Sequence, residues 1–373
     1  MNAMLGYRTL IAVCGWGFAA VLSGCAEPPL TCGDPANNED CAAEIQKRLD
    51  NARVPGVSVA VIQNFRLVEQ WSLGFLGEDD SRPVTLTTPF QAGDLSMPVT
   101  ALGTLVWLEQ SGGHLDQTIN DTLRQWQVPD ESGWGGDQVT VRHLLSHRSG
   151  LSPSGFRGYP SGSSLPTWLE MLNGTGVANS DRVRLTAAPG ENCNYSAAGY
   201  EVLSYWLEQQ AQMSFAGWQN SAVFTPLNIP ARYQLIGLPP PAAGHDWRGE
   251  VVESGYRRYS EQAALGLWAT PTDLSRVLLE VMASARGQGR IITDPTLSSA
   301  MLTAQGCAWG LGWVIDRKGT ETEFSQRGST AGYRAYMVGQ VRSGNGLVVM
   351  TNGDRGDRII DAVVTAVRRD YNW

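Results

Sequence analysis

Alternating apolar residues near the start of the chain predict a pair of strands. Apolar side chains alternate with smaller or polar ones over residues 57–62, and Gln63-Asn64 turns the chain into a second segment over 66–73. A period of two is typical of strands, and the short connection predicts an antiparallel hairpin. A helix is predicted over residues 40–53, where Pro55-Gly56 ends it.

The end of the chain shows a second strand-rich region followed by a helix. Short apolar segments separated by Gly-containing turns predict four more strands. These strands cover 310–316, 321–326, 333–341 and 347–351, and the helix carries Ile359, Ile360, Val363, Val364 and Val367 on one face.

The middle of the chain has a mostly helical pattern, interrupted by long loops rich in Gly, Pro and Ser. Its first helix begins after Phe90 and has an apolar face that includes Leu95, Val99 and Leu102. We therefore predict an α/β (α+β) domain over 39–373. Its sheet part (39–92 and 305–373) comes from both chain ends, and a helical part (93–304) is inserted between them.

The first 24 residues resemble a bacterial lipoprotein signal. Arg8 is followed by an apolar stretch and by the lipobox Leu22-Ser23-Gly24-Cys25, so Cys25 is expected to carry a lipid after cleavage. The alternative is a plain secretory signal with an incidental cysteine. Because Ala26 follows the cysteine, we expect anchoring at a bacterial outer membrane, facing the periplasm or the cell surface. Residues 25–38 are predicted to be a tether.

Composition and charge narrow the function classes. The chain is 42% hydrophobic and 17% charged, as in ordinary globular proteins. Its net charge of −8 becomes more negative when Arg8 is removed with the signal, which argues against a nucleic acid partner. The membrane is expected to be contacted through the lipid on Cys25. No cofactor and no metal are expected, and the His143/His147 pair is interpreted as a short helix under a loop.

The cysteines suggest an oxidising compartment. Cys32 and Cys41 are close in sequence, and their spacing predicts a disulfide that joins the tether to the first helix.

The residues from Phe90 to Ala101, FQAGDLSMPVTA, resemble the start of the active-site helix in the serine β-lactamase, DD-peptidase and esterase superfamily. Several other segments also resemble this superfamily. The most specific of them runs from Val139 to Leu151 and reads VTVRHLLSHRSGL. The resemblance covers nearly all of residues 40–373. It implies the β-lactamase/DD-peptidase-like fold, with an antiparallel sheet flanked by helices. It also implies that Cys193 and Cys307 lie near the pocket, where they form either a second disulfide or buried free thiols.

The first catalytic motif of that superfamily, Ser-x-x-Lys, is replaced here. Asp94 stands at the serine position and Met97 at the lysine position. The only lysines, Lys47 and Lys318, have no serine three residues before them, so no Ser-x-x-Lys exists anywhere in the chain. The activation of a serine by a nearby amine is therefore not available.

The other two motifs are also altered. Tyr-x-Asn corresponds to Tyr195-Ser196-Ala197, which keeps the tyrosine and loses the asparagine. The Lys/His-Thr/Gly-Gly motif on the strand that lines the pocket corresponds to Gln326-Arg327-Gly328. The resemblance further places one oxyanion-binding N–H group near Ser329. Asp94, Tyr195, Arg327 and Ser329 are thus predicted to line the pocket.

These departures give three hypotheses. The first is a lipid-anchored pseudoenzyme that binds a cell-wall peptide, an acyl ligand or a protein partner. The second is an active serine-hydrolase-type enzyme with rearranged chemistry that uses Asp94, Ser96 or Ser196, and the third is an envelope scaffold with a closed cleft. For Asp94 itself we predict an ion pair with Arg327 across the pocket, and the alternative is a helix cap.

Overall fold

A computed structural model describes residues 28–35, 38–131 and 133–373. The predicted signal peptide and lipidation site, including Cys25, lie outside these residues. Among the helices that the model describes, none is long and apolar enough to cross a membrane.

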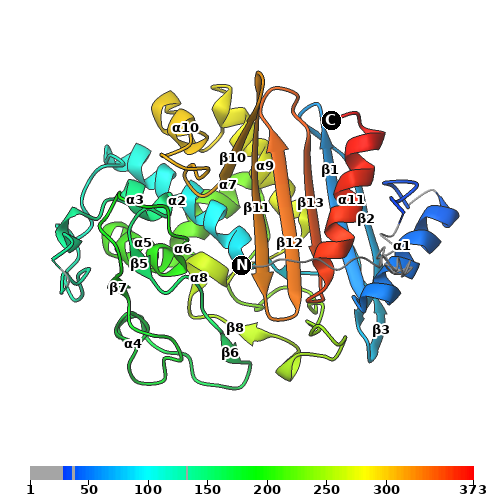
Figure 1. The fold of residues 1–373 in the computed structure, drawn as a ribbon, viewed down its shortest axis with the longest axis horizontal. Coiled ribbons are helices and arrows are strands. Elements are labelled where there is room, and N and C mark those ends of the chain that lie inside the picture. The colour runs from blue at the N-terminus through cyan, green and yellow to red at the C-terminus, as the bar shows by residue number, and fades with distance from the viewer. Residues whose placement is uncertain (1–27, 36–37, 132) are drawn as a thin grey trace, which may run out of the picture.

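A seven-stranded antiparallel sheet forms the centre of the molecule (Figure 1). Its order is β10-β11-β12-β13-β1-β2-β3, so strands from the two chain ends meet where β1 pairs with β13. This confirms the predicted sheet built from both ends. The strands are β1 (Gly56–Gln63), β2 (Arg66–Gly77), β3 (Asp80–Pro83), β10 (Val314–Lys318), β11 (Glu321–Thr330), β12 (Tyr333–Gln340) and β13 (Gly346–Thr351).

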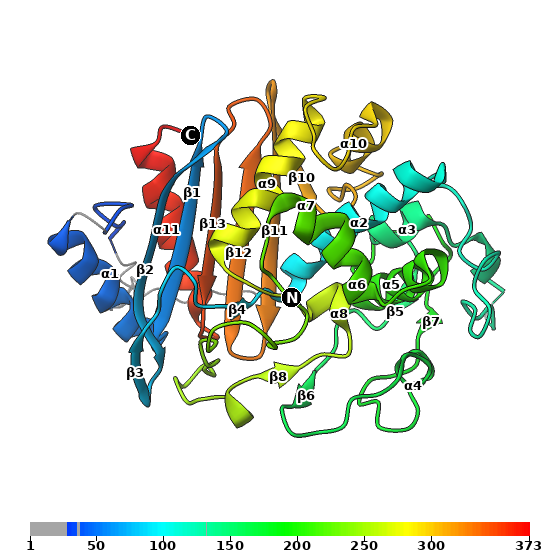
Figure 2. The same cartoon turned by 180° about the vertical axis from the view of Figure 1, so that it is seen from behind.

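Helices cover both faces of the sheet (Figures 1 and 2). The terminal helices α1 (Glu39–Ala52) and α11 (Gly356–Asp370) pack on one face and share a hydrophobic core with β1, β12 and β13. Helix α9 (Pro271–Ala285) packs against β1, β12 and β13 from the other side. Val364, which was predicted to lie on the apolar face of α11, is only half-buried.

The remaining elements form the helical part at one end of the sheet. Its central helix is α2 (Ser96–Ser111), which is buried on nearly all sides rather than on one face. The other helices are α3 (Val141–Leu145), α4 (Trp168–Asn173), α5 (Ala197–Ala211), α6 (Phe215–Gln219), α7 (Thr225–Leu227), α8 (Gln262–Leu265) and α10 (Pro295–Met301). Shorter helical turns are η1 (Gly93–Leu95), η2 (Gly136–Gln138), η3 (Asn220–Phe224) and η4 (Glu253–Gly255).

Three two-stranded ladders connect the loops of the helical part. They pair β4 (Phe90–Gln91) with β9 (Trp268–Ala269), β5 (Leu151–Ser152) with β7 (Arg184–Leu185), and β6 (Tyr159–Pro160) with β8 (Arg257–Arg258).

One predicted strand starts later than expected. Residues 310–313 are irregular and β10 begins at Val314, because Gly312 adopts a positive φ of 85° that is incompatible with a regular strand.

Residues 28–35, within the predicted tether, lie against the domain. Leu30 is only 1% exposed, and its carbonyl accepts a hydrogen bond from Arg369 of α11 at 2.5 Å. The backbone N–H of Gly33 donates to Asp370 at 2.7 Å, and Arg48 of α1 donates to the carbonyl of Pro28. This segment is therefore packed onto the two terminal helices.

Candidate functional site

Two glycines bring the start of the helical part close to β11. Gly93 opens η1 with a φ of 55°, and a Cβ atom there would lie 2.6 Å from the backbone nitrogen of Ser329. A Cβ atom at Gly328 would lie 2.1 Å from the carbonyl oxygen of Ala92. Only glycine permits this approach of two backbones, which places the next residue of η1, Asp94, beside the strand.

The carboxylate of Asp94 joins both sides of the site. Its Oδ1 accepts a hydrogen bond from the hydroxyl of Tyr195 at 2.5 Å, and its Oδ2 accepts one from the backbone N–H of Ser329 at 2.9 Å. The cap positions of η1 and α2 are Ala92 and Leu95, and neither makes a side-chain cap. Asp94 is therefore not the helix cap that the sequence allowed.

The protonation states of Asp94 and Tyr195 follow from their surroundings. Burial raises the pKa of Asp94 above its usual range, while hydrogen bonds from Tyr195 and Ser329 oppose that change. Burial, and then the neighbouring Asp94, raise the pKa of Tyr195 far above its usual value. Tyr195 therefore stays protonated at neutral pH and acts as the hydrogen-bond donor.

The predicted ion pair between Asp94 and Arg327 is wrong. Arg327 donates instead to Asp357 at 3.0 Å and to Asp361 at 2.7 Å, both on α11. Successive residues of a strand point to opposite faces. Because Gly328 faces η1, the preceding Arg327 points toward α11, and its side chain is 53% exposed.

The other motif positions lie around the same point. Met97 is buried, and its sulfur lies 3.4 Å from the Tyr195 hydroxyl. Ala197 is buried at the start of α5, and Gln326 is nearly buried in the wall of the site. In the structure these positions lie in one region around Asp94 and Tyr195.

The two serines considered as substitute nucleophiles are both buried in structural roles. Ser96 donates to the carbonyl of Gly93 at 2.6 Å and accepts from the N–H of Leu267 at 3.1 Å. Ser196 caps α5 by accepting from the N–H of Gly199 at 2.9 Å. Neither side chain lines the cleft described next.

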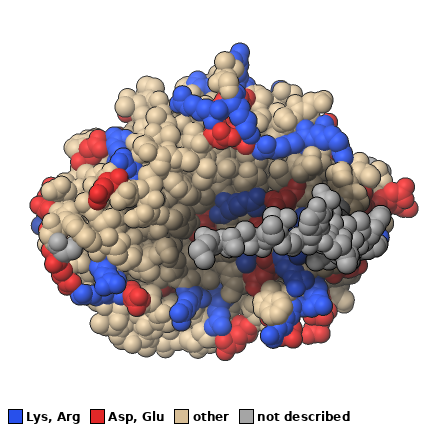
Figure 3. Space-filling view, in the orientation of Figure 1, with Lys and Arg blue, Asp and Glu red and all other residues tan. Residues whose placement is uncertain are grey.

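A cleft of about 520 Å³ opens beside Asp94. Strand β10 pairs with β11 only as far as Ser325, so the following part of β11 has an edge without a neighbouring strand. On this face of the molecule, basic and acidic side chains lie next to each other in a central hollow (Figure 3). The lining residues are Asp94, Tyr195, Trp309, Val314, Ser325, Gln326, Arg327, Ser329 and Tyr336.

The sequence analysis missed the aromatic rings around Tyr195. Trp309 lies 5.5 Å from Tyr195, and His147 lies 4.4 Å from each of them, measured between ring centroids. Burial lowers the pKa of His147 to about 3, so this ring is neutral. Its Nδ1 accepts from the N–H of Ser196 at 3.2 Å. The only available signal for Trp309 was its position two residues after Cys307.

The two histidines lie in and just after a short helix. His143 lies in the short helix α3, and His147 follows it under the Tyr195 loop. Within the described ranges, no group of three or more His, Cys, Asp or Glu residues is arranged to hold a metal ion.

Both candidate disulfides are present. Cys32 is bonded to Cys41, which joins the N-terminal segment to α1. Cys193 is bonded to Cys307, with a Cα–Cα distance of 6.5 Å. Because Tyr195 and Trp309 each follow one of these cysteines by two residues, the second disulfide joins the two loops that supply the aromatic wall of the cleft.

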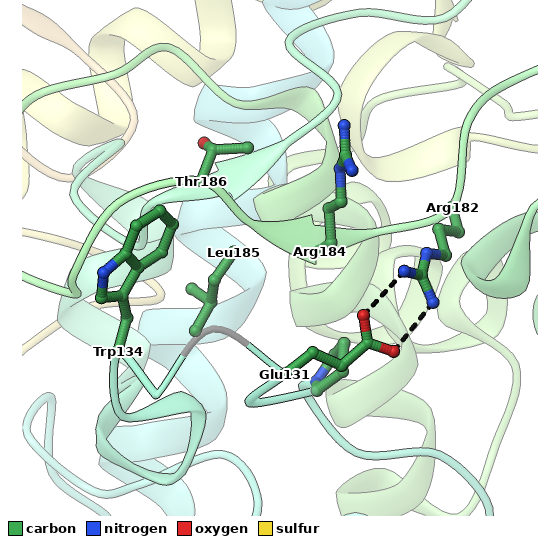
Figure 4. Close-up of a pocket in the computed structure, with 7 residues that line it drawn as sticks. Glu131, Trp134, Arg182, Arg184, Leu185 and Thr186 are labelled. Carbon is green, nitrogen blue, oxygen red and sulfur yellow. Dashed lines mark hydrogen bonds and ion pairs between the residues drawn. The ribbon is translucent and has the colours of Figure 1, made fainter.

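A second hollow, of about 420 Å³, lies in the helical part (Figure 4). Its charged walls are partly paired, since Arg182 donates to both oxygens of Glu131 at 2.8 and 2.7 Å. Trp134, Arg184 and Thr186 also line it. None of the predicted site residues contributes to this hollow.

Known proteins match this chain over most of its length. A family model described as "Beta-lactamase" matches residues 41–368. Penicillin-binding protein 4* of Bacillus subtilis (strain 168) is 24% identical over 331 residues, which cover 79% of this chain and 67% of that protein.

Solved structures show the same fold. The octameric penicillin-binding protein homologue from Pyrococcus abyssi aligns with a TM-score of 0.72 at 21% identity, covering 88% of this chain and 76% of that one. The D-amino acid amidase from Ochrobactrum anthropi SV3, complexed with L-phenylalanine, aligns with a TM-score of 0.70 at 20% identity, covering 89% and 98%. The β-lactamase/DD-peptidase-like fold expected from the sequence is thus confirmed.

Proposed function

This chain belongs to the beta-lactamase family, and on that premise we propose that it is a ligand-binding member that does not turn over substrate through an acyl-serine. The observation that carries the proposal is the position of the Asp94 carboxylate, which is hydrogen-bonded to both Tyr195 and the backbone N–H of Ser329.

Acyl transfer needs a nucleophile, a base and donors for the developing oxyanion. By resemblance, the nucleophile position is Asp94 and the lysine position is Met97, which cannot accept a proton usefully. The N–H of Ser329, expected to bind the oxyanion, already donates to Asp94. A carboxylate at this point also repels a developing negative charge. Three parts of the reaction are thus replaced or occupied.

The alternative of a rearranged hydrolase has less support. Ser96 and Ser196 are buried and hydrogen-bonded to the backbone, away from the cleft. The open cleft of about 520 Å³ also favours binding over a scaffold with a closed cleft. A cell-wall peptide, an acyl ligand and a protein segment are the candidate ligands.

The test is covalent labelling. The protein with Cys25→Ser is incubated with a fluorescent penicillin and with a fluorophosphonate, and the intact mass is then measured. We expect no adduct. A variant with Asp94→Ser and Met97→Lys, which restores a nucleophile and an amine at the required spacing, serves as the matched comparison. A stoichiometric adduct on Ser96 or Ser196 of the otherwise native chain would refute the proposal.

We also propose that the protein is exported and held at a membrane by a lipid on Cys25. The lipobox motif and the two disulfides support this, because disulfides form in oxidising compartments. Fractionation of cells that express the native chain or Cys25→Ser tests it. We expect the native chain with the membranes and the variant in the soluble fraction; an unchanged distribution would show that the lipid is absent.

A further inference from the structure

The charges that line the cleft are few. Only Asp94 and Arg327 are charged among the lining residues, and the remainder are aromatic, aliphatic or neutral polar side chains. The resemblance implies that relatives carry lysine at the position of Met97, and lysine or histidine at the position of Gln326. The positive charges expected from the resemblance are therefore missing, and a negative one has been added.

The charge of Arg327 is compensated by neighbouring residues. Its guanidinium is held by Asp357 and Asp361 and lies 4.9 Å from the ring centroid of Tyr336. Because the carboxylates of Asp357 and Asp361 both contact the guanidinium of Arg327, an anionic ligand would gain little from approaching Arg327.

A second arginine, Arg334, is compensated in the same way. Arg334 lies close enough to Asp94 to lower its pKa slightly, but it forms an ion pair with Asp354 at 3.0 Å. It also donates to the carbonyl oxygens of Thr330 and Tyr333 at 2.9 and 2.7 Å. Its donors are thus directed at the protein itself, so neither Arg334 nor Arg327 is directed at Asp94.

Asp94 can still accept hydrogen bonds. A carboxylate offers about four acceptor positions. Tyr195 and Ser329 account for one on each oxygen, and part of the side chain faces the cleft. An anion placed here would meet a carboxylate, whereas an ammonium group would find both opposite charge and free acceptors.

The aromatic wall suits the same ligand. The ring centroids of Tyr195 and Trp309 lie 5.5 Å apart beside Asp94, whereas Tyr336, which pairs with Arg327, lines the cleft from the α11 side. Aromatic faces attract organic cations and also bury hydrocarbon. Arg327 above Tyr336 already shows one cation held this way at the rim.

We infer that the cleft binds an organic cation, with its ammonium group against the Asp94 carboxylate and its hydrocarbon part against Trp309 and Tyr195. This inference rests on the proposed non-hydrolytic function and assigns the ligand class of the same site. A peptide with a free amino group and a small aromatic amine both satisfy it.

The pH dependence follows from the groups that face Asp94. Burial raises the pKa values of Tyr195 and Tyr259, so both hydroxyls stay neutral over the relevant range, and the guanidinium of Arg334 is paired with Asp354. Asp94, whose pKa burial raises, is therefore the group that titrates. Affinity for the cation is lost as the pH falls through that pKa, and binding releases protons when measured near it.

The experiment compares three ligands that share one ring but differ in charge: benzylamine, benzyl alcohol and benzoate. Affinities are measured by titration calorimetry on the protein with Cys25→Ser. We expect benzylamine to bind at least about tenfold more tightly than the other two, from the charge and the cation–π contact together. Equal binding, preferred binding of benzoate, or no binding of any of the three at millimolar concentration would overturn the inference.

Variants separate the site from general charge effects. Asp94→Asn is expected to lower benzylamine affinity about tenfold and to weaken benzyl alcohol binding much less, because only the amine loses an ionic contact. Asp116→Asn removes one carboxylate outside the cleft, paired with Arg142, and is expected to change nothing. Trp309→Ala, which leaves the hydrogen bonds of Asp94 in place, should weaken benzylamine binding independently. If Asp94→Asn and Trp309→Ala both bind like the parent protein, the assignment is wrong.

Failure of this inference is distinguishable from failure of the proposed function. A covalent adduct or hydrolysis in the labelling experiment would refute the absence of turnover. A protein that forms no adduct but prefers benzoate would refute only the ligand class.

Discussion

Removing the disulfide between Cys193 and Cys307 should cost more stability than removing the one between Cys32 and Cys41. The bonded pairs are 114 and 9 residues apart in sequence. In the chain-entropy model, a disulfide stabilises the protein by restricting the unfolded chain, and the effect grows with the length of the closed loop. These separations correspond to about 4.8 and about 2.6 kcal/mol at room temperature.

The two double variants, each with both cysteines changed to serine, form a matched pair. Each removes two sulfurs and one bond, so the difference between them reports mainly the loop length. The long-loop variant should be less stable by about 2.2 kcal/mol. Equilibrium unfolding in guanidinium chloride without reductant measures this, with fluorescence and circular dichroism followed together to check that unfolding is two-state.

Two results would refute the reasoning. If the Cys32/Cys41 variant is the less stable of the two, loop closure is not the dominant effect. If the Cys193/Cys307 variant loses less than about 1 kcal/mol, the unfolded state is already restricted where the disulfide acts.

Three further predictions concern the cleft. Asp94→Asn should become more stable relative to the native chain as the pH rises from about 4, because burial raises the pKa of Asp94 in the folded state and ionising it then destabilises the native fold. Denaturation over a pH series measures this, and a difference in stability that does not change with pH would contradict it. Arg327→Ala should lower the free energy of unfolding by at most about 1 kcal/mol, since its ion pairs are half-exposed; a loss of 3 kcal/mol or more, typical of breaking a buried pair, would contradict this. Gly93→Ala should cost more than the roughly 1–2 kcal/mol of a left-handed backbone alone, with Gly112→Ala as control because it has positive φ and no neighbour within 4 Å; equal melting temperatures would contradict it.

The sheet could be predicted from the sequence because its signal is local. Short runs rich in β-branched and aliphatic residues over 57–62 and 347–351, bounded by turn residues, indicate strands, and the structure places these segments in one sheet. The alternation did not show that β1 and β13 are buried on both faces, since helices cover both sides of the sheet. The start of β10 was misjudged because Gly312 interrupts the strand through its backbone conformation, which the alternation does not reveal.

The site could be predicted in position but not in contacts. Asp94, Tyr195 and Ser329, which the motifs assign to the pocket, are joined by hydrogen bonds in the structure. The partner of Arg327 was missed because it depends on which face of β11 the side chain points to and on acidic residues of α11 that follow 30 positions later. The ring of Trp309 was missed because loops far apart in sequence bring it to His147.

The packing of the N-terminal segment would hold the domain close to a membrane if Cys25 carries the proposed lipid. Only Ala26 and Glu27 separate Cys25 from Pro28, and from Pro28 onward the chain is held by Arg48, by Arg369 and by the Cys32–Cys41 bond. Three residue-to-residue steps span at most about 11 Å. A lipid on Cys25 would therefore hold the α1 and α11 end of the molecule almost against the bilayer. Every molecule would then present the cleft at nearly the same height above the lipid surface.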